Sequence, residues 1–199
     1  MNLENSKMVF IAIGLVSMLL FGSPTLALVV PLPSGEKFSE LWLLGPNQMA
    51  TGYPFNVSEN VNYTVYVGVG NHMGSSAYYI VEVKLRNETE PLPDLEAGTE
   101  SPLPSLYENR LFVQDGGTWE SPLVFSFSGV SFGANQSRIE GLTINGVELN
   151  VEKEVSWDAE RSGYYYELFI ELWIYNANSN PSFEFNNRFV GLWLNMTGS

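Results

Sequence analysis

Apolar residues recur at every second position along most of the chain, which is the period of a β-strand. In VNYTVYVGVG, residues 61–70, all the valines share one face with the first tyrosine. In YYIVEVKL, residues 78–85, the second tyrosine, both valines and the leucine do the same. The NHMGSS sequence between the two segments is short and contains glycine. We therefore predict a β-hairpin over residues 61–86.

The same alternation marks further segments, and no helical period longer than one turn occurs beyond the N-terminal region. Asn145-Gly146 lies between alternating apolar residues and predicts a two-residue hairpin turn. The chain is therefore predicted to be all-β, with one antiparallel β-sandwich over residues 38–199. The further strands are expected at residues 38–44, 105–113, 123–130, 164–176 and 188–196. The residues expected in the core are Val65, Val67, Val81, Val83, Phe125, Phe127, Leu168, Ile170, Leu172, Leu192 and Leu194.

Residues 88–105, ETEPLPDLEAGTESPLPS, interrupt the alternating pattern. They contain five acidic residues, four prolines and no basic residue, a composition typical of a linker. A hairpin on their N-terminal side would not be stable alone, so a domain boundary here is disfavoured. We interpret the segment as a long surface loop that crosses between the two sheets of one sandwich.

The N-terminus has the organisation of an export signal. A short polar stretch with one lysine precedes an apolar run at residues 8–22, and Thr25 and Ala27 have the −3 and −1 spacing of a signal-peptidase site. Cleavage after Ala27 would make residues 1–27 a signal peptide. The alternative is a retained membrane anchor over residues 8–31, which is long enough to span a bilayer. Both interpretations predict an extracellular domain at the cell surface, held at a membrane only if the segment is retained.

Several motifs resemble an archaeal family known as domain of unknown function 1616. They are FSELWLLGPN and GYPFN near the start of the domain, VNYTVYVGVGNH, TWESPLVFSF, YYYELFIELWIY and the closing GLWLNMT. The resemblance spans residues 38–197. It implies an extracytoplasmic, immunoglobulin-like sandwich next to membrane helices, with no known reaction. This chain departs from the family in its single N-terminal hydrophobic segment and in an extra hairpin near residues 139–157.

Composition and charge narrow the classes of function. The net charge is −13, from 22 acidic and 9 basic residues, so the protein would repel nucleic acid. The chain has no cysteine and one histidine, His72, so the usual zinc sites are excluded. A Ser-His-Asp triad would have to use this histidine. No calcium-binding loop or nucleophile elbow is present. We therefore expect no metal, no cofactor and no enzymatic activity.

Acceptor sequons for N-linked glycans are the one repeated chemical signal. Chance would give about two or three sequons in a chain of this composition. The chain has five, which begin at Asn56, Asn62, Asn87, Asn135 and Asn195. Several of them flank expected turns, so we predict that at least three carry glycans. A glycan coat would also keep a surface with few charges soluble.

The strand YYYELFIELWIY has a second face that combines glutamates with aromatic residues. Leu168, Ile170 and Leu172 must face the core, which puts Phe169, Trp173 and Tyr175 on the other side. We expect that side to be half exposed, and exposed aromatic residues mark contact surfaces. It would be a sugar platform, a subunit interface or a surface covered by the 139–157 hairpin.

The N-terminal extension, residues 28–37, suggests how such a domain could assemble. LVVPLPSG is uncharged and apolar, and an immunoglobulin-like sheet with an unfilled edge can accept a strand from a neighbour. Leu28, Val29, Val30 and Leu32 are the expected contact residues. This organisation is similar to that of archaeal thread-type pili. We therefore expect a secreted, glycosylated filament or envelope subunit that forms homo-oligomers; the alternative is an anchored module that binds a protein or glycan.

Overall fold

A computed structural model describes residues 7–17, 36–178 and 181–198 of the chain, which divides into two units at Phe38. Residues 7–17 of the first unit are helical. Within the described ranges, no helix has the length and apolar character needed to cross a membrane. The expected cleavage site after Ala27, and most of the expected anchor over residues 8–31, lie outside the described residues.

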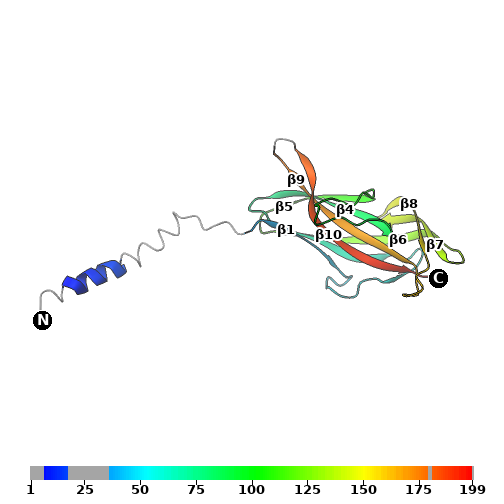
Figure 1. The fold of residues 1–199 in the computed structure, drawn as a ribbon, viewed down its shortest axis with the longest axis horizontal. Coiled ribbons are helices and arrows are strands. Elements are labelled where there is room, and N and C mark those ends of the chain that lie inside the picture. Colours follow the sequence, from blue (N-terminus) through cyan, green and yellow to red (C-terminus); the bar gives the residue numbers. More distant parts are fainter. Residues whose placement is uncertain (1–6, 18–35, 179–180, 199) are drawn as a thin grey trace. The chain divides into compact units, whose positions relative to one another are not determined.

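The second unit is an antiparallel β-sandwich of two five-stranded sheets (Figure 1). The first sheet has the order β1-β3-β6-β7-β8, with β1 Phe38–Leu44, β3 Tyr63–His72, β6 Thr118–Phe132, β7 Gln136–Ile144 and β8 Val147–Ser156. The second sheet has the order β2-β10-β9-β4-β5, with β2 Asn56–Val57, β10 Ser182–Met196, β9 Tyr165–Asn176, β4 Ala77–Asn87 and β5 Tyr107–Val113. All pairs of named strands are antiparallel except β2 with β10.

The prediction of an all-β, immunoglobulin-like sandwich is confirmed. Every residue that the alternation assigned to the core is buried, with at most 8% of its surface exposed. The turn at Asn145-Gly146 is also confirmed: it joins β7 to β8, and both residues have positive φ, 49° and 83°. Positive φ at both central positions is the geometry of the type I′ turn that matches the twist of a hairpin.

The predicted hairpin over residues 61–86 is wrong. β3 and β4 lie in opposite sheets, and residues 73–76 carry the chain from one sheet to the other. Both strands bury their alternate valines in the core that they share. Alternation shows which face of a strand is buried, but it is the same whether two strands pair side by side or face each other across a core.

The interpretation of residues 88–105 as a crossover between sheets is also wrong. They join β4 to β5, which are neighbours in the second sheet. The segment leaves β4 and returns to the same sheet, and it contacts the outer face of β4 and β9 on the way through Ser101. Its polar composition therefore predicted a long surface loop correctly, but it did not predict that the following strand lies in the same sheet.

Two buried tyrosines connect the sheets across the core. Tyr166 on β9 donates a hydrogen bond to the backbone carbonyl of Ser137 on β7, at 2.8 Å. Burial raises the pKa of Tyr166 to about 12. Tyr79 on β4 lies 2.9 Å from the hydroxyl of Ser39 on β1 and donates to Asn71. These bonds satisfy hydroxyls that would be costly to bury alone.

Candidate functional site

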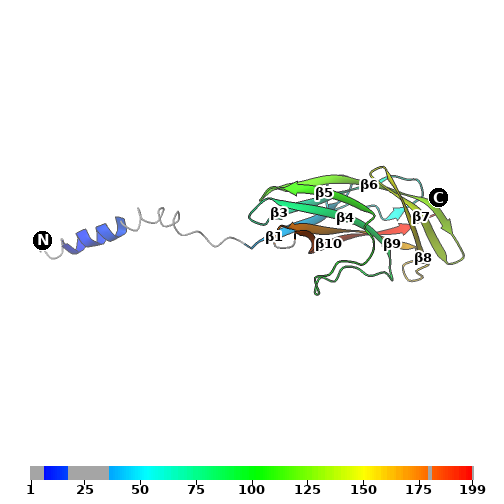
Figure 2. The same ribbon diagram turned by 90° about the horizontal axis from the view of Figure 1, so that it is seen from above.

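A groove runs between β1 and β10, which lie side by side in both views of the fold (Figure 1 and Figure 2). It consists of two cavities of about 550 and 510 Å³ and is called the β1–β10 groove below. The first cavity is lined by Phe38, Ser39, Glu40, Leu41, Trp42, Leu95, Asn187, Arg188 and Phe189. The second is lined by Leu41, Trp42, Leu43, Tyr53, Pro54, Phe55, Val190, Gly191, Leu192 and Trp193. Two residues of β1, Leu41 and Trp42, thus line both cavities.

The edge of β10 along this groove is unpaired over most of its length. β9 pairs with one edge of β10, and the other edge meets β2 only at Asn195 and Met196. The N–H groups of Asn195 and Thr197 point to the β2 side, where they donate to Phe55 and Val57. Because backbone groups alternate along a strand, the odd-numbered residues upstream present their N–H and C=O groups to the groove.

Those odd-numbered residues are Phe189, Gly191 and Trp193. The pairing of β10 with β9 keeps one register from Arg188 to Asn195, so the alternation is not interrupted there. No described strand satisfies these three N–H and three C=O groups. An edge of this kind is a template for one more strand.

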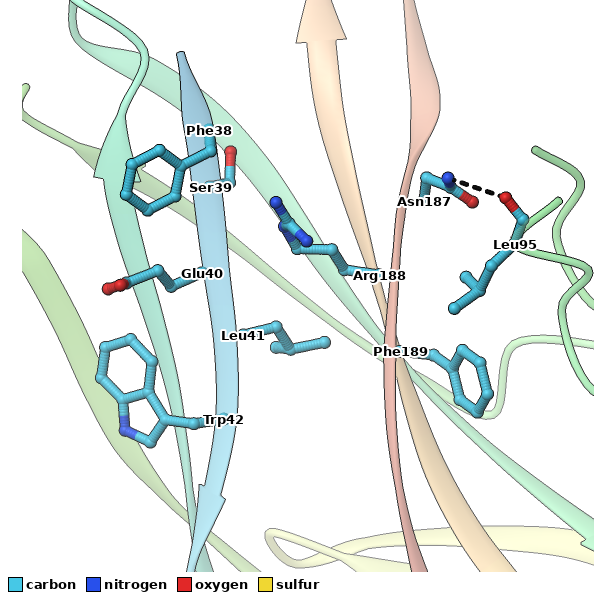
Figure 3. Close-up of a pocket in the computed structure, with 9 residues that line it drawn as sticks. All are labelled: Phe38, Ser39, Glu40, Leu41, Trp42, Leu95, Asn187, Arg188 and Phe189. Atoms are coloured by element: carbon cyan, nitrogen blue, oxygen red, sulfur yellow. Dashed lines mark hydrogen bonds between the residues drawn. The ribbon is translucent and has the colours of Figure 1, made fainter. Parts of the chain in front are cut away.

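The opposite wall of the groove is β1, the edge strand of the first sheet. Leu43, near the end of β1, has its carbonyl occupied by the hydroxyl of Tyr53 at 2.8 Å. Ser39 at the other end turns its hydroxyl into the core toward Tyr79, whose pKa is raised by burial. Between them, Leu41 points into the space between the strands (Figure 3). β1 is also an edge strand, and its even-numbered residues pair with β3, so the backbone groups of Leu41 face the groove without a described strand partner.

A β-bulge shapes one end of the groove. The register of β10 against β9 shifts between Phe185 and Arg188, and Asn187 within the shift has a positive φ of 56°. Asn187 also donates a hydrogen bond to the carbonyl of Leu95 at 3.0 Å. Arg188 extends toward β1, while Phe189 points to the other face of the sheet (Figure 3). The Nε of Arg188 is buried without a hydrogen-bond partner among the described residues.

The alternation of β1 also explains two glycines on β3. Trp42 pairs with Gly68, and Glu40 pairs with Gly70. A Cβ atom on Gly68 would lie 2.0 Å from the indole ring of Trp42, and one on Gly70 would lie 2.5 Å from a carboxylate oxygen of Glu40. The sequence VGVG therefore provides the space that the large side chains of β1 require.

The glutamate-aromatic face of β9 is buried as far as Glu171, so the expected half exposure is wrong there, and the face becomes partly exposed beyond that residue. Phe169 has no exposed surface, so it is not accessible to a partner, whereas Trp173 is half-buried and Tyr175 is 40% exposed. The buried part is covered by the 88–105 loop, whereas the 139–157 hairpin was the cover in one of the three alternatives. Ser101 in this loop donates its backbone N–H to the carboxylate of Glu171 on that face at 2.9 Å. The hairpin instead belongs to the first sheet as β7 and β8.

The same covered face carries two buried ion pairs that the sequence did not reveal. Lys84 donates to Glu171 at 2.8 Å and to the carbonyl of Ser101 at 3.0 Å. Arg86 donates to Glu167 at 2.6 Å. At most 9% of any of these four charged side chains is exposed. They hold a covering loop in place through charge-assisted hydrogen bonds.

The five sequon asparagines differ in accessibility. Asn56, Asn62 and Asn135 are exposed. Asn87 is half-buried, and its side chain caps its own turn and donates to the carbonyl of Glu154. Asn195 is also half-buried, and its amide donates to the side chain of Asn56.

The remaining positions that the sequence singled out are the histidine and the residues of the N-terminal extension. His72 ends β3, where its ring stacks on Phe38 and its Nε2 lies 3.4 Å from a carboxylate oxygen of Glu40. Within the described parts of the chain, no three His, Cys, Asp or Glu side chains are grouped in a way that could hold a metal ion. The expected contact residues Leu28, Val29, Val30 and Leu32 lie outside the described residues.

Comparison with solved structures gives matches of low similarity. A β-glucosidase from Listeria innocua in complex with isofagomine matches with 8% identity and a TM-score of 0.41, over 82% of this chain and 16% of that chain. A mutant of that enzyme in complex with laminaribiose matches with 10% identity and a TM-score of 0.42, over 81% and 16%. The complex of Zinc 2-glycoprotein and Prolactin inducible protein from human seminal plasma matches with 8% identity and a TM-score of 0.35, over 83% and 100%.

The chain thus spans about one sixth of the length of the β-glucosidases. No curated protein matches its sequence. A family comparison, in contrast, matches residues 32–140, which is more than half of the chain. The matched segment includes β1, the loop to β2, and the strands from β3 to β6. The chain therefore belongs to the family described as Domain of unknown function (DUF1616).

Proposed function

We propose that this protein is a secreted, N-glycosylated structural component of an archaeal cell surface. In this role it is a subunit of a filament or envelope layer, and it assembles through its N-terminal segment. The observation that carries the proposal is the unpaired edge of β10 in the β1–β10 groove, next to the start of β1. An open edge on a domain that also carries an apolar extension combines both halves of a strand-addition contact.

The surface chemistry supports an extracellular structural role. Three sequon asparagines are exposed, so glycans there would add polar surface without disturbing the fold. The charged side chains that the fold buries are engaged in holding a loop rather than in lining a cleft. Assembly of this kind requires no reaction, and we propose that the protein is not an enzyme.

A comparison of two forms tests the proposal. All core residues that the structure describes lie within the second unit, which begins at Phe38, so a form that starts there retains both sheets. Residues 28–199 should form oligomers or filaments in sedimentation velocity and electron microscopy, and residues 38–199 should remain monomeric. If both forms remain monomeric at high concentration, assembly is refuted. The alternative, an anchored module that binds a protein or glycan partner, then becomes the working hypothesis.

A further inference from the structure

We infer that the free edge of β10 accepts residues 28–36 of a second copy as an added antiparallel strand. This inference rests on the proposed function and goes further, because it names the acceptor backbone, the bonding residues of the donor and its direction. The acceptor groups are the N–H and C=O of Phe189, Gly191 and Trp193, which no described strand satisfies. The donor sequence is LVVPLPSGE.

The positions of the two prolines select which donor residues form hydrogen bonds. Pro31 and Pro33 have no N–H, and both occupy odd positions. In an extended strand, residues of the same parity present their backbone groups to the same side. The even-numbered Val30, Leu32 and Ser34 can therefore donate three N–H groups to β10 while both prolines face away from it. The prolines are thus compatible with a donor strand that pairs along only one of its edges.

The same parity determines on which face of the sheet each donor side chain would lie. Residues that pair directly across an antiparallel ladder have side chains on the same face of the sheet. Val30 and Leu32 would therefore lie with Trp193 and Phe189 on the outer face. Val29 and the two prolines would fill the apolar groove between the strands, which Leu41 and Val190 line.

The ends of the groove set the direction of the donor. Tyr53, Pro54 and Phe55 line one end, where β2 already pairs with Asn195 of β10. The other end is lined by Phe38, Asn187 and Leu95, and no strand of the described residues pairs with the groove edge of β10 there. The donor's own sandwich follows residue 36 directly, so it must leave at this unblocked end. The donor therefore runs from the β2 end toward Asn187, antiparallel to β10.

A second copy suits this site better than the molecule's own segment. Residues 28–36 connect directly to β1, which begins at Phe38 at the unblocked end of the same groove. To enter its own groove, the segment would have to reverse direction just before β1 and use its last residues for the turn. Ser34 would then be lost from the ladder. A segment from a neighbour needs no turn and keeps all three bonding residues, Val30, Leu32 and Ser34, in the ladder.

Two matched pairs of variants in residues 28–199 test the inference. Phe189→Pro removes an edge N–H without removing any bond to β9, whereas Phe189→Ala keeps that N–H. On the donor side, Leu32→Pro removes a bonding N–H and Pro31→Ala does not. We expect both proline variants to be monomeric by sedimentation velocity, and both alanine variants to assemble. Unchanged circular dichroism of the Phe189→Pro variant will show that the sandwich is intact.

Peptide binding gives a second readout that does not depend on how the variant folds. A synthetic peptide of residues 28–36 should bind to residues 38–199. Its Leu32→Pro version should bind about tenfold more weakly, because it loses one hydrogen bond and gains a ring. Failure of the unmodified peptide to bind overturns the inference. So does normal assembly by a folded Phe189→Pro variant; in that case the proposed function stands if residues 38–199 are still monomeric. If residues 28–199 are also monomeric, the proposed function fails as well.

Discussion

The buried ion pair between Lys84 and Glu171 makes a quantitative prediction about stability. Glu171 has no exposed surface, and its carboxylate accepts hydrogen bonds from Lys84 at 2.8 Å and from the backbone of Ser101 at 2.9 Å. Lys84→Met removes the ammonium and leaves the carboxylate buried with Ser101 as its remaining donor. The loss of one partner of a buried pair costs about 3–5 kcal/mol in the free energy of unfolding. Whole domains have only about 5–15 kcal/mol.

Urea denaturation will measure this loss. With an m-value of about 2 kcal/mol/M, the midpoint should fall by about 1.5–2.5 M. Combining Lys84→Met with Glu171→Gln removes both charges and keeps a side-chain oxygen as the acceptor for the buried Ser101 N–H. The double variant should therefore return to within about 1 kcal/mol of the parent protein. Arg110→Met is the control, because Arg110 and its partner Glu108 are exposed and such pairs contribute about 0–1 kcal/mol.

The 88–105 loop provides a second measurement of the loss of the Lys84–Glu171 pair. Lys84 and Glu171 both bond to Ser101, so the single variant should also release the 88–105 loop. We expect faster hydrogen exchange at the Ser101 amide and faster proteolysis within the loop. If the single and double variants lose equal stability, the unpaired carboxylate is not the cause. If the single variant loses less than about 1 kcal/mol, the cost expected for a buried unpaired charge is refuted.

Two further predictions concern pH and glycosylation. Burial raises the pKa of Glu82 on β4, so folding favours its protonated form, and the stability associated with that proton is lost as the pH rises through the raised value. Glu82→Gln mimics the protonated form and should therefore stabilise the protein more at pH 7 than at pH 4 in urea denaturation; equal effects at both pH values would contradict this. Mass spectrometry of the native protein should find glycans at the exposed Asn56, Asn62 and Asn135. Unmodified peptides at all three would refute the predicted glycan coat.

Local alternation along the chain was sufficient to predict most of the strands, their buried faces and one turn. Val81 and Val83 on β4, and Leu168 and Ile170 on β9, were placed in the core by their period of two alone. Side-chain direction is a local property of an extended backbone, so local alternation is sufficient to predict it. The turn at Asn145-Gly146 is local for a similar reason, because both residues tolerate positive φ.

The neighbours of each strand, and the outer faces that are covered, follow from contacts between segments that are distant in the sequence. β3 and β4 carry the alternation of a hairpin but lie in opposite sheets. Lys84 and Glu171 look like solvent-facing charges in sequence, yet they are 87 positions apart and meet beneath a loop. The open edge of β10 depends on where β2 stops pairing. The strand order and the covering of outer faces depend on the free energy of packing between distant segments. Local alternation does not indicate which distant segment will be the partner.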